Sequence, residues 1–263
     1  MRNVFLVSLA LVLGGGPALL AGMQQAPPPG MVLIPAGEFW MGRYSVNGPN
    51  EYLVLERDRL DDQPAHQVSV DGFYMDQYEV TAEEYARFVE ATGAVKPWYW
   101  PGGKVEKGGE RVPVHDVTWE EARSYCAWSG GKRLPSEAEW ERAARGGLDR
   151  KRNPWGDQGG GNRTADGNDR GPVAVGSVPA QNDYGLYDIV GNVWEWTNDW
   201  YQRDYYTISP ETNPQGPSTG DYRVIRGGGW SGGASVQTRN YSDPLYRTSI
   251  VGFRCVKSAG VSQ

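Results

Sequence analysis

The chain has 263 residues, 39% of them hydrophobic, and a formal net charge of −6 at pH 7. This negative charge repels a nucleic-acid backbone, so we expect no nucleic-acid partner. The 36 glycines and 18 prolines, with 11 tryptophans and 15 tyrosines, indicate one loop-rich domain held together by large amphipathic rings.

The N-terminal segment has the features of an exported protein. Residues 1–21 read as a signal peptide, because Arg2 precedes an apolar stretch and Ala21 marks a small-residue cleavage point. The stretch is too short for a stable membrane span. Residues 22–30 contain three prolines and predict a tether to a single domain over 31–258. We therefore expect a periplasmic or extracellular protein.

The first elements predicted along the domain are short strands. Alternating apolar residues and turn signals favour strands over the ranges 31–35 and 38–41 around the Ala36-Gly37 turn, then 66–70 and 73–79, with a polar loop over 44–62. Further strands are expected later in the chain, at 173–175, 223–226 and 252–256.

Three helices are predicted by a repeated start signal. A hydroxyl residue is followed three positions later by glutamate in the pairs Thr81 and Glu84, Thr118 and Glu121, and Ser136 and Glu139. Each pair forms a capping box, in which the two side chains bond each other's backbone amides. The expected helices are Ala82–Thr92, Trp119–Trp128 and Glu137–Arg145, and Gly93 and Gly146 end the first and third.

The two cysteines of the chain are Cys126 and Cys255. An oxidising compartment allows them to form a disulfide, which would stabilise the fold by roughly 4–5 kcal/mol in the chain-entropy model. Two unrelated buried thiols are the alternative at this point.

The segment 187–196, YDIVGNVWEW, is a candidate cation site. Asp188 and Glu195 provide carboxylates, and the turn between them can direct the carbonyls of Gly191 and Val193 to the same point. Ca²⁺ prefers such oxygen ligands. A surface turn anchored by its tryptophans would explain the same residues, because Asp and Glu are common near turns.

Several motifs together resemble one family. In chain order they are MVLIPAGEFWMG at 31–42, FYMDQYEVT at 73–81, VTWEEARSYCAW at 117–128, GKRLPSEAEWERAARGG at 131–147, NPWG at 153–156, YGLYDIVGNVWEW at 184–196, RVIRGGGW at 223–230 and GFRC at 252–255. Their order and content resemble the formylglycine-generating enzymes, or sulfatase-modifying factors. The resemblance covers nearly the whole domain.

The resemblance implies a single irregular α+β domain of C-type-lectin-like type, with little regular secondary structure and structural Ca²⁺. It also implies a disulfide between Cys126 and Cys255, and one Ca²⁺ held by the side chains of Asp188 and Glu195 and the carbonyls of Gly191 and Val193. A second family Ca²⁺ site would fall near Asn162 and Asp169, where the chain aligns poorly.

The catalytic residues that the resemblance implies are missing. Enzymes of this family use two cysteines that bind Cu(I) just after the RGG motif, because thiolates are the ligands that Cu(I) needs. Here the segment 226–240 has no cysteine, and Gly232 and Gln237 stand at the two positions. We therefore expect no catalytic residue of that type and no copper. His66 and His115 are too few for a histidine-rich iron site.

The segment 230–251 is the candidate working face. It is rich in Ser, Gly, Asn and Tyr, the adaptable residues of antibody loops, although ordinary loops share this composition. The ligand-binding residues that we predict are Trp230, Ser231, Asn240, Tyr241, Asp243 and Tyr246. Arg239 and Arg247 are expected to support them.

Three functions are compatible with the sequence. The first is an exported, calcium-stabilised binding or accessory protein without formylglycine-generating activity, whose partner is a protein, peptide or small molecule. The second is a periplasmic oxidase or maturation enzyme of the same superfamily with a non-thiol site. The third is a ligand-binding protein diversified by a retroelement. With Ala234, Gln237–Arg239, Pro244 and Arg247 set aside as scaffold, the 15 remaining positions of 231–251 carry none of the residue types that NNY codons exclude.

Overall fold

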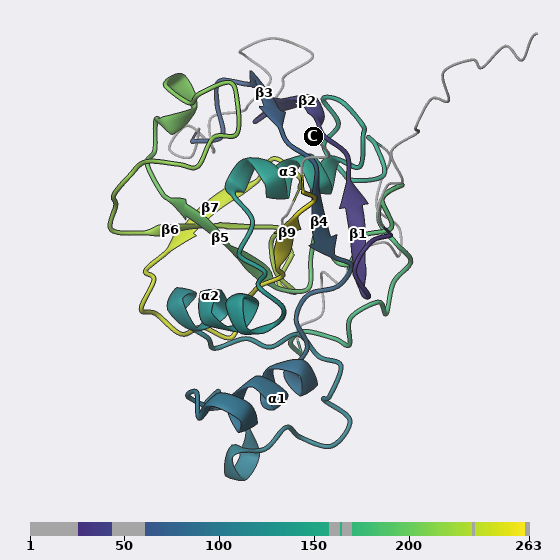
Figure 1. Ribbon diagram of the computed structural model, residues 1–263, viewed down its shortest axis with the longest axis vertical. Helices are drawn as coiled ribbons and strands as arrows, with labels where there is room; N and C mark the ends of the chain where they lie inside the picture. Colours follow the sequence, from purple (N-terminus) through teal and green to yellow (C-terminus); the bar gives the residue numbers. More distant parts are fainter. Residues whose placement is uncertain (1–25, 44–60, 158–163, 165–169, 233–234, 261–263) are drawn as a thin grey trace, which may run out of the picture.

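The computed structural model describes residues 26–43, 61–157, 164, 170–232 and 235–260. In chain order its elements are β1 (Met31–Ile34), β2 (Gly37–Met41), β3 (His66–Val70), β4 (Phe73–Asp76), α1 (Ala82–Thr92), η1 (Pro101–Gly103), α2 (Trp119–Trp128), α3 (Glu137–Arg145), β5 (Trp194–Trp200), η2 (Tyr205–Thr207), β6 (Arg223–Arg226), β7 (Arg239–Ser242), β8 (Val251–Gly252) and β9 (Val256–Ser258). Figure 1 shows α1 at one end of the molecule and β2 and β3 at the other. No helix in these ranges has the length and apolar character needed to cross a bilayer.

The predicted helix bounds are confirmed for α1, α2 and α3. All three capping boxes form, so each hydroxyl accepts a backbone amide while the paired glutamate accepts the amide of the cap residue. Gly93 and Gly146 end α1 and α3 at φ 72° and 58°, in the left-handed region that favours glycine.

The described strands form three sheets, with the orders β1-β4-β9, β2-β3 and β7-β6-β5-β8. The predicted strands over 31–35, 38–41 and 66–70 are confirmed within one residue. However, β1 and β2 do not pair around their turn. β1 pairs with β4 and β2 pairs with β3, both antiparallel, so the two strands enter different sheets.

Other strand predictions were wrong. The segment 173–175 forms no strand; Val175 instead exchanges hydrogen bonds with Arg111. The predicted strand 252–256 is divided between β8, which pairs with β5, and β9, which pairs with β4. The strand expected over 73–79 ends at Asp76. β5 and β7 were not predicted.

Two buried clusters form the core on either side of the candidate cation turn. One contains Ile189 and packs α3 against β1 to β4, and the other contains Trp196 and packs α1 and α2 against Phe253. Segment 187–196 therefore passes from one cluster to the other, which holds its backbone in place.

Candidate functional site

Asp188 has the features expected of a cation ligand. Its backbone is left-handed, with φ 52°, and its side chain is buried. One carboxylate oxygen, Oδ2, accepts the amide of Gly176 at 2.7 Å. The other, Oδ1, is buried and has no hydrogen-bond partner. A buried oxygen without a partner is costly unless a donor or a cation satisfies it.

Glu195 lies in β5 and is fully buried. Its carboxylate already has two partners, since Arg254 donates to it at 2.8–3.0 Å and the indole of Trp140 donates at 2.9 Å. Arg254 belongs to the GFRC motif. A cation at this site would therefore share Glu195 with an arginine, which the sequence did not reveal.

Glu79 is a third buried carboxylate that sequence reasoning missed. Its Oε2 accepts the side-chain amide of Asn192 at 2.6 Å, and its Oε1 accepts the backbone amide of Val193 at 3.2 Å. Glu79 thus fixes the turn whose carbonyls are candidate ligands. Its position in the FYMDQYEVT motif was the available signal.

The three carboxylates carry more negative charge than their surroundings neutralise. Burial raises the pKa of Glu79, Asp188 and Glu195, and the other two carboxylates raise the pKa of Glu79 further. Among the described residues, Arg254 is the one cationic side chain that pairs with this group. The excess negative charge and the partnerless Oδ1 of Asp188 fit a bound cation.

Side chains alone do not complete a metal site. In the described part of the chain, no three His, Cys, Asp or Glu side chains converge as metal ligands. A cation here would also need backbone oxygens such as those of Gly191 and Val193. The second predicted calcium site, near Asn162 and Asp169, lies outside the described residues, as does the predicted signal peptide over 1–21.

Cys126 and Cys255 are joined by a disulfide, with Cα atoms 5.6 Å apart and both residues buried. They are the two cysteines of the whole chain, so no free thiol remains. Gln237 is buried, and Gly232 has φ 90°. Neither can bind Cu(I) or act as a nucleophile.

The two histidines have separate structural surroundings. His115 is buried, stacks on Tyr99 with ring centroids 3.9 Å apart, and contacts Asp116 at 3.0 Å. His66 starts β3 and meets the ring of Tyr206 edge-on at 4.9 Å. The two rings therefore do not share a site.

A buried ionic network holds the start of the 230–251 segment. Arg226 pairs with Glu137 at 3.1 Å and with Glu141 at 2.5 Å, and it donates to the carbonyl of Val236 at 2.7 Å. Arg239 pairs with the same Glu137 at 2.7 Å. Arg239 therefore supports the segment as expected, through α3.

Part of the segment is less accessible than the sequence indicated. Ser235 is buried, and its hydroxyl hydrogen-bonds the hydroxyl of Thr238 at 2.8 Å within a tight turn. Trp230 is half-buried and its amide donates to the carbonyl of Asn192 at 2.7 Å, whereas Ser231 is exposed. This end of the segment therefore lies against the candidate cation turn.

Tyr241 of β7 packs against two tyrosines that sequence reasoning missed, Tyr201 just after β5 and Tyr222 just before β6. The ring centroids of Tyr201 and Tyr222 are 4.2 and 5.1 Å from that of Tyr241. Tyr222 and Tyr241 are 43% and 45% exposed, so their rings form an accessible aromatic surface. The neighbouring Asn240 is half-buried. Pairing of β5, β6 and β7 created this cluster.

Asp243 and Tyr246 belong to one turn. The amide of Tyr246 donates to the carbonyl of Asp243 at 3.0 Å, and the Tyr246 side chain is 64% exposed. Arg247 anchors the turn by donating to the carbonyl of Asp116 at 2.7 Å and pairing with Glu121. The chain then crosses from β7 at one edge of the sheet to β8 at the other. The predicted ligand residues thus occupy successive parts of an extended surface.

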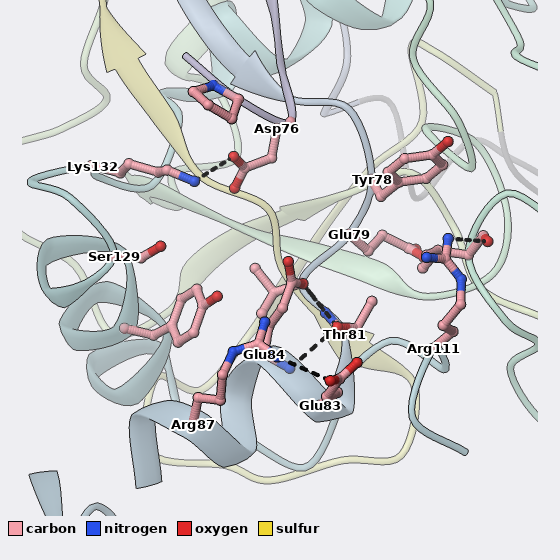
Figure 2. Close-up of a pocket in the computed structure, with 15 residues that line it drawn as sticks. Asp76, Tyr78, Glu79, Thr81, Glu83, Glu84, Arg87, Arg111, Ser129 and Lys132 are labelled. Atoms are coloured by element: carbon pink, nitrogen blue, oxygen red, sulfur yellow. Dashed lines mark hydrogen bonds and ion pairs between the residues drawn. The ribbon is translucent and has the colours of Figure 1, made fainter. Parts of the chain in front are cut away.

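A cavity of about 200 Å³ lies next to Glu79, between β4, α1 and the end of α2. Figure 2 shows Lys132 and Asp76 paired on one side and Tyr78 with Arg111 on another, with Glu83, Glu84 and Arg87 of α1 below. The Lys132–Asp76 pair measures 2.7 Å. Burial raises the pKa of Asp76 even beside this lysine.

Comparison with known proteins agrees with this architecture. The family model of the sulfatase-modifying factor enzyme 1-like domain matches residues 17–259. The chain is 34% identical to the formylglycine-generating enzyme of Bos taurus over 301 residues, covering 91% of this chain and 77% of that protein. It is 39% identical over 252 residues to a Chlamydia pneumoniae protein named serine/threonine-protein kinase pkn1, covering 87% of this chain.

The chain spans 38% of the length of that Chlamydia protein. Among solved structures, PvdO from Pseudomonas aeruginosa superposes with a TM-score of 0.72 at 28% identity, covering 87% of this chain and 94% of PvdO. The fold is a single irregular α+β domain of C-type-lectin-like type. The chain therefore belongs to the family of sulfatase-modifying factor enzyme 1-like domains.

Proposed function

We propose that this protein is an exported binding or accessory member of its family that does not generate formylglycine. The proposal rests on the positions of the two cysteines in the structure. Both cysteines of the chain are in the Cys126–Cys255 disulfide, and Gly232 and Gln237 stand where thiols would be required. Copper binding by thiolates and thiol-based oxidation therefore have no residues to support them.

The test is an activity assay. The purified protein is incubated with a peptide that carries the sulfatase motif, copper and dioxygen, and the peptide is analysed for an aldehyde by mass spectrometry. We expect no aldehyde, while the bovine relative treated in parallel provides the positive control. Aldehyde formation by the present chain would overturn the proposal.

Calcium has a stabilising role in this proposal. Asp188, Glu195 and the carbonyls of Gly191 and Val193 would hold the ion. Its two positive charges would offset the excess of buried carboxylates, and the partnerless Oδ1 of Asp188 would gain a partner. Glu79 would keep the turn in place through Asn192.

Recognition is assigned to the 230–251 surface. The exposed rings of Tyr241 and Tyr246 support this, because tyrosine offers a large contact area at a small entropic cost. Proteins or peptides captured on the immobilised protein are expected to be lost from a Tyr241→Ser, Tyr246→Ser double variant. They should be retained by Ile208→Ser, which changes an exposed apolar residue elsewhere. Equal capture by both variants would contradict this assignment.

A further inference from the structure

Two unpaired charges of opposite sign line the cavity beside Glu79. Glu84 uses Oε2 to accept the amide and hydroxyl of Thr81, at 2.9 and 2.8 Å, and no cation among the described residues pairs with it. Arg111 donates to the carbonyl of Val175 at 3.2 Å, and no described carboxylate pairs with it. Figure 2 shows that the two side chains come from different segments, Glu84 from α1 and Arg111 from the chain before α2.

The other charged groups of the cavity already have partners within the protein. Asp76 pairs with Lys132 at 2.7 Å, and Glu83 pairs with Arg87 at 3.1 Å. Glu79 is bonded to the 192–193 turn. A ligand would therefore meet one available carboxylate, on Glu84, and one available guanidinium, on Arg111.

Aromatic and small apolar groups also line the cavity. The ring of Tyr78 is 5.6 Å from the guanidinium carbon of Arg111 and holds it by a cation–π contact. Tyr125, Val80 and Val175 also line the cavity. Its volume of about 200 Å³ is smaller than that of pockets for drug-sized ligands, roughly 300–1,000 Å³. The occupant should thus be a small molecule.

We propose that this cavity binds a free α-amino acid as its zwitterion. The ammonium group would donate to the open Oε1 of Glu84, and the carboxylate would accept the paired N–H groups of Arg111, which suit a carboxylate. The side chain would lie against Tyr78 and Tyr125. No described residue of the 230–251 segment lines this cavity.

The test begins with thermal shift measurements of the purified protein in saturating calcium, with each of the common L-amino acids added. At least one should raise the melting temperature, and calorimetry then gives its affinity. The N-acetyl and methyl ester analogues, which each lack one charge, should bind at least about tenfold more weakly. Lack of any shift, or equal binding of the blocked analogues, would refute the proposal.

Matched variants connect the binding to the two charges. Glu84→Gln keeps the capping box, which accepts Gln at this position, and removes the charge. Arg111→Gln removes the guanidinium. Both should lower affinity at least about tenfold, while Glu90→Gln and Lys107→Gln, exposed outside the cavity, should leave it unchanged. An equal loss of affinity in the control variants would refute the assignment of the two charges to Glu84 and Arg111. Because calcium stays saturating and the aldehyde assay is separate, failure here leaves the proposed function standing.

Discussion

Arg226 and Glu141 form an ion pair of 2.5 Å in which neither side chain is exposed to solvent. The pair joins β6 to α3. Arg226 also donates to the carbonyl of Val236. The conformation of the 230–251 segment therefore depends on a buried charge pair that is 85 residues apart in the sequence.

Replacing Arg226 with methionine should be strongly destabilising. Removal of Arg226 leaves the buried negative charges of Glu137 and Glu141 less well neutralised. Breaking such a buried pair typically costs about 3–5 kcal/mol. The free energy of unfolding from urea titration measures the loss. Arg123→Met removes an exposed pair with Glu120 and should cost less than about 1 kcal/mol. Similar losses in both variants would contradict the role given to the network.

Chelation of calcium should lower the melting temperature of the protein. A ligand that binds only the folded state at 100 times its dissociation constant stabilises by about 2.7 kcal/mol. The shift on adding EGTA should disappear in Asp188→Gly, which removes the carboxylate and tolerates the positive φ of this position. Asp183→Gly, in the same loop but exposed, should retain the shift. An EGTA shift that is the same in both variants would exclude Asp188 as a ligand.

The disulfide should contribute substantially to stability. Its cysteines are 129 residues apart, and removal of a native disulfide commonly costs about 2–5 kcal/mol. Non-reducing peptide mass spectrometry should find Cys126 linked to Cys255. The Cys126→Ser, Cys255→Ser double variant should unfold at lower urea concentration than the wild type. Two free thiols in the folded protein would refute this expectation.

Asp199 should make stability fall as the pH rises. Burial, and then the nearby charge of Glu137, raise the pKa of this carboxyl well above its ordinary value. Above the ordinary value, near pH 3.9, the unfolded chain releases its proton while the folded protein retains it. The unfolded state then binds fewer protons, so the free energy of unfolding decreases until the pH passes the folded-state pKa.

The variant Asp199→Asn removes this dependence. Its side-chain oxygen can still accept the amide of Glu137, which Asp199 accepts at 2.8 Å. Relative to wild type, the variant should gain stability as the pH rises above about 4, measured by urea titration at each pH. A difference between the two proteins that does not change with pH would show that Asp199 does not titrate as inferred.

The sequence determined the three helices almost completely. The hydroxyl and glutamate of each capping box are three residues apart, so the start signal is local and needs no tertiary partner. Gly93 and Gly146 likewise act through their own backbone conformation. Family membership was also readable from the motifs, as was the absence of thiols near Gly232.

Only the tertiary structure decided the strands and the charge balance of the sites. β5 forms because Trp194 and Glu195 pair with Val251 and Gly252 of β8, and because Glu195 also pairs with Arg226 of β6. Such pairing depends on distant residues, and no local pattern encodes it. For the same reason the sequence did not place Glu79 beside Asn192, or Glu84 and Arg111 in the lining of one cavity. The pKa values of these carboxylates and their ion pairs depend on burial and on neighbouring charges, and both exist only once the chain has folded.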